Sequence, residues 1–282
     1  MNAYVELTKP RILVMQLVTL SLGFFLAPGD HSATVFLVAM VGTGLVSGGA
    51  AVWNHVLEKD VDAKMERTMN RPLPKGIIST LQAAFLGTLL LAAGLLLLVF
   101  LVNALTAFLA FLTAFLYVAI YTPLKRISWL NTMVGAVPGA LPPLGGWAAA
   151  TGSLSPQSWV LFALLFVWQL PHFYAIAWMY KTDYERGGFK MLSVIDDDGS
   201  RSARQILIHS TLLLAVSFLP FYFRMLGLIY LVGALILGIY LIREGLQFAK
   251  TKSHTDARRV LKASVYYLCA LLALVVVDKA VG

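Results

Sequence analysis

The sequence is poor in cysteine and in charge. Its single cysteine, Cys269, excludes an intramolecular disulfide and any metal site built from several thiolates. Charged residues make up 13% of the 282 residues and hydrophobic residues 59%, a balance that excludes an ordinary soluble domain. Met1 to Thr8 is polar, and no small-residue cleavage site ends a short apolar core, so we predict no cleavable signal peptide. A polytopic membrane protein is the class that remains.

What is abundant is apolar sequence in long runs. A membrane-spanning helix needs about 20 mainly apolar residues. The runs that approach or reach this length are 12–27, 33–57, 80–102, 104–120, 129–150, 157–179, 204–223, 225–243 and 263–279. They predict an all-α fold of one integral-membrane domain, residues 1–282, with about nine transmembrane helices around a central cavity.

Nearly all cations fall on one side of this arrangement. With the N-terminus inside, only Arg224 and Lys279 among the 22 Lys and Arg lie outside. This asymmetry fits the positive-inside rule and predicts an N-in, C-out topology with polar loops 58–79 and 180–203 in the cytoplasm. The net charge of +8 then follows from topology and from attraction to anionic lipids of the bilayer, so no nucleic-acid partner is predicted.

The loops repeat at an interval of four helices. Long polar inner loops follow the second and sixth predicted helices, and shorter basic loops follow the fourth and eighth. This pattern predicts two parallel four-helix halves with an added ninth helix. The segment Asn54–Asp62 and the region of Asp183 would then face each other across the central cavity.

Asn54, Glu58 and Asp62 recur at four-residue spacing where the second apolar run ends. Four residues turn a helix by about 400°, so these side chains lie along one face. Oxygen ligands of this kind suit Mg²⁺, which takes one or two carboxylates and completes its coordination with water and substrate phosphates. Arg67 and Arg71 follow closely, and phosphate is the ligand that needs both metal and cations. The alternative is that these polar residues simply leave the bilayer at a helix end; spacing alone does not separate the two.

Two predicted helices carry unusual residues at membrane depth. The fifth contains Pro138 and Pro142, and irregular backbone inside a membrane is tolerated only against protein or a cavity. The sixth contains His172, whose cost in a membrane helix indicates either a functional role or a hydrogen bond to a neighbouring helix. In the second, Gly42, Gly44, Gly48 and Gly49 are interpreted as packing residues, and Gly44 and Gly48 have the small-xxx-small spacing that lets membrane helices approach closely.

Several segments together resemble the UbiA-type membrane prenyltransferases. They are the Asn54–Glu58–Asp62 motif followed by MERTMNRPLPKG, the segment YTPLKRISWLNT, and the block PHFYAIAW…DYERGGFKML. The likeness runs from TKPR near the N-terminus to about residue 195. The ERT–RPL segment and His172 bring it nearest to the branch of protoheme IX farnesyltransferases, or heme O synthases.

The resemblance implies a reaction. A farnesyl group passes, with Mg²⁺, from farnesyl diphosphate to a vinyl group of heme b together with a hydroxyl from water, giving heme O and diphosphate in heme O and heme A biosynthesis. It further implies a bacterial cytoplasmic (inner) membrane with the site facing the cytoplasm. Heme A synthase or terminal-oxidase assembly is implied as a partner.

The resemblance also implies site residues. Asn54, Glu58 and Asp62 would form the first metal–diphosphate motif, with Glu58 where many relatives carry Asp. The second motif is usually two Asp residues four apart, whereas here Asp183 is followed at that spacing by Gly187. We therefore expect Asn54, Glu58, Asp62 and Asp183 as metal ligands and as catalytic residues.

The remaining candidates divide between the two substrates. Arg offers phosphate a bidentate fork and Lys a point charge, and both stabilise a leaving diphosphate. The diphosphate-binding candidates are Arg67, Arg71, Lys125, Arg126, Lys181 and Lys190. Trp53, Phe173 and Tyr174 could stabilise an allylic cation by cation–π contact if they face inward, and they are candidates for heme binding. His172 is a candidate catalytic residue, as heme-iron ligand or as base.

Other functions fit parts of the sequence. A prenyltransferase of the same superfamily could use a quinone precursor or a chlorin as acceptor. A secondary transporter would explain the broken fifth helix and the repeat, although transporters bind substrate near the midplane rather than at inner helix ends. A structural assembly factor would not explain the three oxygen donors on one helix face.

Overall fold

The computed structural model describes residues 2–281, and within them every regular element is a helix. Seven helices are long and apolar enough to cross a membrane. The helices before the first long connection are α1 (Ala3–Leu7), α2 (Pro10–Leu26) and α3 (Ala33–Asp62). The next are α4 (Thr80–Leu101), α5 (Ala104–Phe115), the π-helix η1 (Leu116–Tyr121), α6 (Thr122–Leu124), α7 (Asn131–Ala140) and α8 (Pro142–Thr151). The last are α9 (Pro156–Met179), α10 (Lys181–Arg186), α11 (Ser200–Val216), α12 (Leu219–Tyr222), α13 (Leu228–Thr251) and α14 (His254–Val281).

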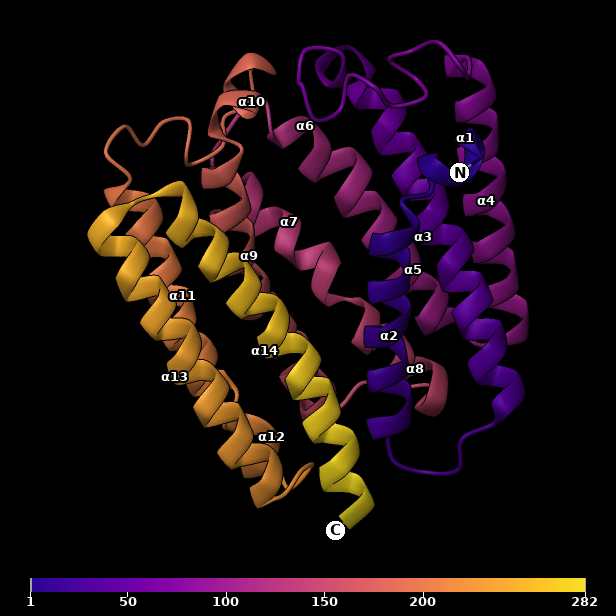
Figure 1. The fold of residues 1–282 in the computed structure, drawn as a ribbon. Coiled ribbons are helices and arrows are strands. Elements are labelled where there is room, and N and C mark those ends of the chain that lie inside the picture. The colour runs from indigo at the N-terminus through magenta and orange to yellow at the C-terminus, as the bar shows by residue number, and fades with distance from the viewer. Residues whose placement is uncertain (1, 282) are drawn as a thin grey trace.

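The predicted apolar runs form helices, but two of the runs do not form one helix of full membrane-spanning length. The first run forms α2, which has only 17 residues. The fifth forms two helices of 10 residues each, α7 and α8. The all-helical membrane fold is confirmed, whereas the count of nine spans and the N-in, C-out orientation stay predictions. The two termini lie toward opposite ends of the bundle (Figure 1).

The break between α7 and α8 falls at Leu141, directly before Pro142. Proline lacks the N–H that would continue the helical ladder, which is why the run divides here. α8 packs against α2 and α5, while α7 packs against α9 and η1. Gln169 of α9 donates from Nε2 to the Ala136 carbonyl of α7 at 3.3 Å. The broken segment thereby joins the two sides of the molecule.

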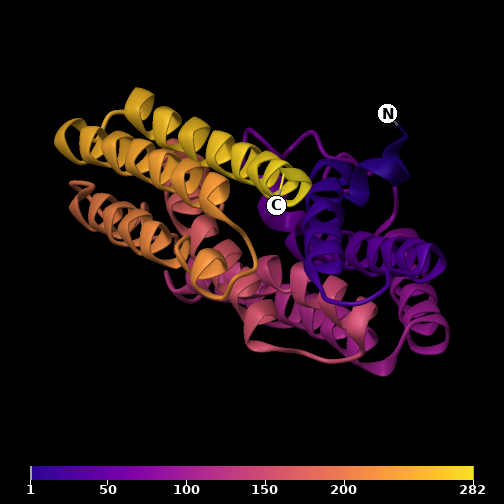
Figure 2. The same cartoon turned by 90° about the horizontal axis from the view of Figure 1, so that it is seen from below.

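The last helix, α14, packs on the second half of the chain. α14 packs against both α13 and α9, and α11 packs against α9 and α13. In Figure 2 the orange α11 and the amber to yellow α13 and α14 run side by side, with most of the indigo helices on the other side of the view. The division into two four-helix halves with an added ninth helix stays a prediction, and the proline-broken segment packs on helices of both sides.

The packing role expected of the α3 glycines is confirmed for Gly42 and Gly49, which bring α3 and α4 into close contact. A Cβ on Gly49 would lie 2.7 Å from the Gly87 carbonyl oxygen of α4, and one on Gly94 would lie 2.6 Å from that of Gly42. Gly44 and Gly48 instead line a groove of about 330 Å³, where a Cβ would meet nothing nearer than 3.5 Å. The prediction that Gly44 and Gly48 provide the close packing is wrong, because they point between α2 and α3.

Candidate active site at one end of the bundle

The C-terminal end of α3, α6 and α10 lie at the same end of the bundle (Figure 1). The Ser32 side chain caps the start of α3 by accepting from the Val35 N–H, and the helix continues to Asp62. The predicted inner loop therefore begins at residue 63, not 58, and the second one contains the short helix α10. As a result Glu58 and Asp62 are held by a regular helix.

Asn54, Glu58 and Asp62 lie on one buried face of α3. Their relative exposures are 0%, 4% and 1%, although all three are polar and two carry charge. Burying such groups is costly unless each finds a partner. The partners therefore define the site.

Each of the two carboxylates is paired with a cation from another segment. Lys125, directly after α6, places Nζ 2.7 Å from Glu58 Oε1. Arg71, in the segment after α3, places Nη1 2.8 Å from Asp62 Oδ2. Burial opposes the charge on Lys125, but Tyr121 and Glu58 outweigh it and raise its pKa above the usual range. The pairs bring together two predicted metal ligands and two predicted diphosphate-binding cations.

Asn54 is held by residues from the N-terminal segment and from α6. Its Oδ1 accepts from Lys9 Nζ, which also donates to the Tyr117 hydroxyl at 3.0 Å, and its Nδ2 donates to Thr122 Oγ1 at 2.9 Å. Burial lowers the pKa of Lys9 to about 7, against the opposing attraction of Glu58. All three oxygen donors of the α3 face are thus met by a basic side chain.

Asp183 binds the segment that follows α3. Its Oδ1 accepts from the Glu66 backbone N–H at 3.2 Å, and Arg186 Nη1 lies 3.9 Å away. This contact joins α10 to the 63–79 segment. The partners of Asp183 are therefore a backbone N–H and Arg186 rather than the carboxylates of α3.

Arg67 and Arg126 have contacts of their own. The Arg67 guanidinium donates to the Tyr184 hydroxyl at 3.3 Å and lies 4.5 Å from the centre of the Tyr180 ring. Arg126 donates to the Leu57 carbonyl at 3.5 Å. Both are exposed at the polar end, so both can turn toward a ligand there.

Lys181 and Lys190 differ in what they contact. Lys181 Nζ donates to the Asp196 carbonyl at 2.9 Å and lies 5.2 Å from the Trp178 ring centre, on the side of α9 and α11. The Lys190 side chain is exposed, and its backbone N–H donates to the Lys125 carbonyl at 2.6 Å. Lys190 is therefore adjacent to the paired cations through its backbone, whereas Lys181 is engaged elsewhere.

His172 faces α14. Its Nδ1 lies 2.9 Å from Ser264 Oγ, and its ring stacks on Trp168 with centroids 5.3 Å apart. The Phe173 ring is 5.7 Å from it. The hydrogen bond to a neighbouring helix, one of the two explanations for a histidine at this depth, is present.

Trp53 and Tyr174 lie apart from one another. Trp53 packs on α4, where a Cβ on Gly87 would approach its ring to 2.9 Å. Tyr174 is 1% exposed, and its hydroxyl has no hydrogen-bond partner among the described residues. Its ring lies 5.9 Å from that of His209 on α11. Trp53 and Tyr174, two of the three predicted aromatic contacts of heme, therefore pack against different helices.

With this geometry established, the chain can be compared with known proteins. The model of the UbiA prenyltransferase family matches residues 16–272. The chain belongs to the UbiA prenyltransferase family. Family membership makes it an enzyme, a prenyltransferase, and sets aside the transporter and the assembly factor.

Named relatives and solved structures agree with the family. The chain is 44% identical to the protoheme IX farnesyltransferase of Solibacter usitatus, covering 99% of each chain, and 45% identical to that of Salinibacter ruber, covering 98% of each. Its fold is similar to that of a digeranylgeranylglyceryl phosphate synthase, with a TM-score of 0.82 at 18% identity over 98% and 97% of the two chains. It is also similar to a UbiA homolog from Archaeoglobus fulgidus bound to GPP and Mg²⁺, with a TM-score of 0.67 at 14% identity over 97% and 99%.

The oxygen donors of this UbiA prenyltransferase fit a magnesium ion. Asp62 Oδ1 is buried without a hydrogen-bond partner among residues 2–281, beside the Arg71-bound Oδ2. A hard oxygen ligand in that condition suits a hard cation. Among residues 2–281, however, no three His, Cys, Asp or Glu side chains converge tightly enough to enclose a metal by themselves. Water and substrate phosphate would have to complete the coordination.

Two residues of the site lay outside the sequence-based candidates. Lys9 of the TKPR segment is not among the predicted site residues, yet it reaches Asn54. His55 is 2% exposed, and its Nδ1 lies 3.8 Å from Asp62 Oδ2. The signal for His55 was available, because it precedes Asp62 by seven residues, about two helical turns.

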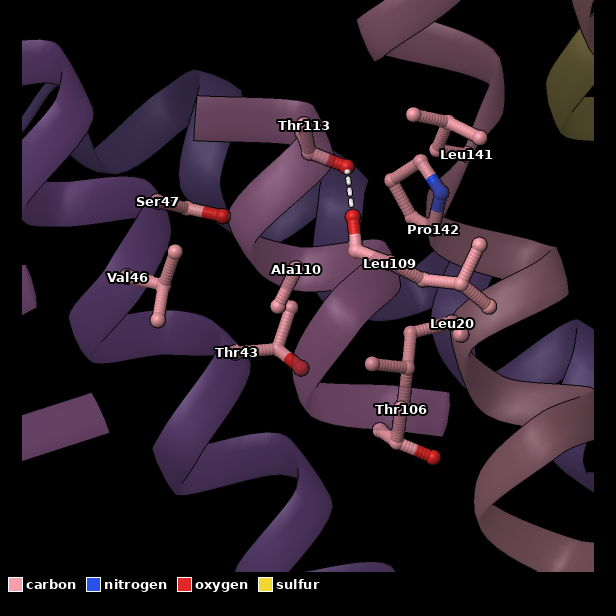
Figure 3. A pocket seen from close by; sticks show the side chains of 11 residues that line it. Leu20, Thr43, Val46, Ser47, Thr106, Leu109, Ala110, Thr113, Leu141 and Pro142 are labelled. Carbon is pink, nitrogen blue, oxygen red and sulfur yellow. Dashed lines mark hydrogen bonds between the residues drawn. The ribbon is translucent and has the colours of Figure 1, made fainter. Parts of the chain in front are cut away.

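A narrow cavity continues the same face of α3 away from the polar end. Thr43 and Ser47 lie about three and two turns before Asn54, and they face α5 and the α7–α8 break (Figure 3). The cavity measures about 20 Å³, room for about one water molecule, and Thr106 Oγ1 on its wall has no hydrogen-bond partner. The wall residues are Leu20, Thr43, Val46, Ser47, Thr106, Leu109, Ala110, Thr113, Leu141, Pro142 and Gly145.

Proposed function

We propose that this chain transfers a farnesyl group from farnesyl diphosphate to a vinyl group of heme b, with Mg²⁺, giving heme O and diphosphate. The observation that carries the proposal is the pairing of two buried carboxylates with Lys125 and Arg71 at one helix end. Such a site offers a metal its oxygens and a diphosphate its cations. The names of relatives at 44% and 45% identity support heme as the acceptor.

The bond changes assign work to particular residues. The bond between farnesyl C1 and the diphosphate oxygen breaks, C1 joins a vinyl carbon, and a water hydroxyl adds to the neighbouring carbon with release of a proton. Lys125 and Arg71 bind the diphosphate as it leaves, and their positive charge stabilises its developing negative charge. Asn54, Glu58 and Asp62 would hold Mg²⁺, which when bound adds positive charge at the leaving oxygens.

Water must be kept from the allylic cation until the carbon–carbon bond forms. The α3 face supports this, since Asn54, Glu58 and Asp62 are all at most 4% exposed. A dry site also strengthens each charge interaction within it. Aromatic faces near the polar end, among them Tyr121 and Phe189 around Lys125, are suited to cationic groups.

The acceptor site belongs, in this proposal, to the neighbourhood of His172. His172 and Phe173 lie on α9, about two and a half turns or fewer before α10, deeper than the diphosphate-binding residues. Asp183 remains a proposed ligand of the second half of the site, and Arg67, Arg126, Lys181 and Lys190 remain proposed diphosphate contacts. Trp53 and Tyr174 remain proposed contacts of the acceptor.

The proposed setting is the bacterial cytoplasmic membrane, with the polar end of the bundle toward the cytoplasm. Seven long apolar helices support an integral membrane protein. Heme O would pass from the enzyme to a heme A synthase or to the assembly of a terminal oxidase.

The direct test is incubation of the purified protein with farnesyl diphosphate, heme b and Mg²⁺. We expect a porphyrin whose mass increases by one farnesyl group and one hydroxyl, with one diphosphate released for each product. The Asp62→Asn variant is the control, because it keeps the shape of the site and removes its charge. Diphosphate release that needs a quinone precursor or a chlorin, with heme unchanged, would instead support the other acceptors.

A further inference from the structure

His55 is a buried histidine whose burial is not explained by any hydrogen bond of its ring within residues 2–281. It lies on α3 beside Asn54, is 2% exposed, and neither ring nitrogen has a hydrogen-bond partner in the part of the chain that the structure describes. Burying a polar group without a hydrogen-bond partner lowers the stability of the fold, so each such group calls for an explanation. His55 Nδ1 lies 3.8 Å from Asp62 Oδ2.

Arg71 binds one carboxylate oxygen of Asp62, which leaves the other oxygen available to a ligand. Asp62 Oδ2 accepts from Arg71 at 2.8 Å, and Asp62 Oδ1 has no hydrogen-bond partner within the described part of the chain. The Arg71 side chain is 27% exposed whereas that of Asp62 is 1% exposed, so Arg71 can turn outward while Asp62 cannot. Arg71 is also one of the two cations that the proposed function requires at the diphosphate.

The charges favour a turn of Arg71 from Asp62 to the diphosphate when Mg²⁺ and the diphosphate bind together. The pairs Lys125–Glu58 and Arg71–Asp62 are neutral as they stand. Bringing in Mg²⁺ alone adds two positive charges to a buried site, and bringing in a fully ionised prenyl diphosphate alone adds three negative ones. Together they add only one negative charge, which favours binding both and sharing the cations with the diphosphate.

Resting on the proposed function, we infer that His55 is the positioning residue that holds Asp62 when Arg71 turns to the diphosphate. The neutral imidazole donates its Nδ1–H to Asp62 Oδ2, which needs an approach of about 1 Å from the present separation. Asp62 Oδ1 then stays directed at Mg²⁺. Hydrogen bonds to a ligating carboxylate fix its orientation, and their loss typically costs about 10–100-fold in metal affinity.

The test measures Mg²⁺ affinity rather than turnover. Mg²⁺ is titrated by calorimetry into protein saturated with the non-reacting thiolo analogue of farnesyl diphosphate. His55→Leu fills the space but cannot donate, and we expect it to weaken Mg²⁺ binding about 10–100-fold. His55→Asn places an amide donor near the position of Nδ1, and we expect it to recover most of the affinity.

A matched control and thermal unfolding separate positioning from folding. His209 on α11 is also buried, with Nδ1 2.7 Å from the Gln205 carbonyl, and His209→Ala should leave Mg²⁺ affinity unchanged. If His55→Leu does not fold, the comparison of wild type with His55→Asn decides, since a folded His55→Asn that has lost the affinity overturns the inference.

The outcomes also distinguish this inference from the proposed function. A folded His55→Leu variant that binds Mg²⁺ as tightly as wild type overturns the role of His55 and leaves the enzyme assignment intact. A wild-type protein that binds neither Mg²⁺ nor the farnesyl analogue overturns both. Weakened binding in His55→Leu with recovery in His55→Asn supports the positioning role.

Discussion

Lys125 Nζ lies 2.7 Å from Glu58 Oε1, joining the end of α6 to the end of α3. The side chains are 13% and 5% exposed, so the pair is largely withdrawn from water. Removing one member leaves the other charge buried and unpaired. This single contact therefore serves both the stability of the helix end and the proposed site.

Lys125→Met should lower the free energy of unfolding by on the order of 3 kcal/mol, and Glu58→Gln in the same chain should restore part of the loss. The Lys125 pKa is raised in the folded protein, so its contribution is complete below the unfolded pKa and is lost only as pH rises through the still higher folded one. Thermal unfolding in detergent should hence show a constant difference between wild type and Lys125→Met from pH 7 to pH 9. A difference that disappears across this range would contradict the ion pair.

Asp62→Ala should abolish turnover, because Asp62 Oδ1 is the buried oxygen left for a metal. Glu58→Asp should retain activity, since it keeps the charge and only shortens the reach. Porphyrin mass analysis at varied Mg²⁺ concentration measures both. Normal turnover by Asp62→Ala would show that the metal binds elsewhere.

His172→Ala should reduce the use of heme more than the binding of farnesyl diphosphate. His172 contacts Ser264 of α14 and Trp168, not the carboxylates of α3. Heme titration by absorbance and farnesyl diphosphate binding by calorimetry are measured on the same variant, with Ser264→Ala as the control for the helix contact. Loss of diphosphate affinity with heme affinity unchanged would assign His172 to the donor site or the scaffold.

Gly49→Ala should destabilise the protein, whereas Gly44→Ala on the same helix should be tolerated. The added Cβ would lie 2.7 Å from the Gly87 carbonyl oxygen in the first case and 3.9 Å from Leu17 in the second. We expect a loss of about 1–3 kcal/mol for Gly49→Ala from overpacking. Unfolding temperatures of the two variants decide, and equal temperatures would mean that α3 and α4 are not in such close contact.

Reporter fusions at Asn70 and at Lys190 should both report the cytoplasm. The segment 63–79 and helix α10 are in contact through Asp183 and the Glu66 backbone, so they must lie on the same side of the membrane. Excess Lys and Arg at this end set that side as the inner one. A fusion at either position that reports the opposite side would refute the topology.

The sequence alone determined the class of fold and one face of the site. Long apolar runs cross a membrane as helices, because a helix pairs all of its backbone N–H and C=O groups within its own segment. Four-residue spacing put Asn54, Glu58 and Asp62 on one face of α3, since this relation depends only on helix geometry. Pro142 likewise predicted irregular backbone in the fifth run, and the break lies directly before it.

Only the tertiary structure decided which residues meet that face. Lys125 pairs with Glu58 across 67 residues of chain, and Lys9 reaches Asn54 across 45. Periodicity within a helix does not set its rotation or its neighbours, which depend on how side chains of several helices pack together. For the same reason the spacing of the α3 glycines did not show that Gly49 packs tightly on α4 while Gly44 and Gly48 face a groove, and only the folded chain shows that α14 packs on α9 and α13.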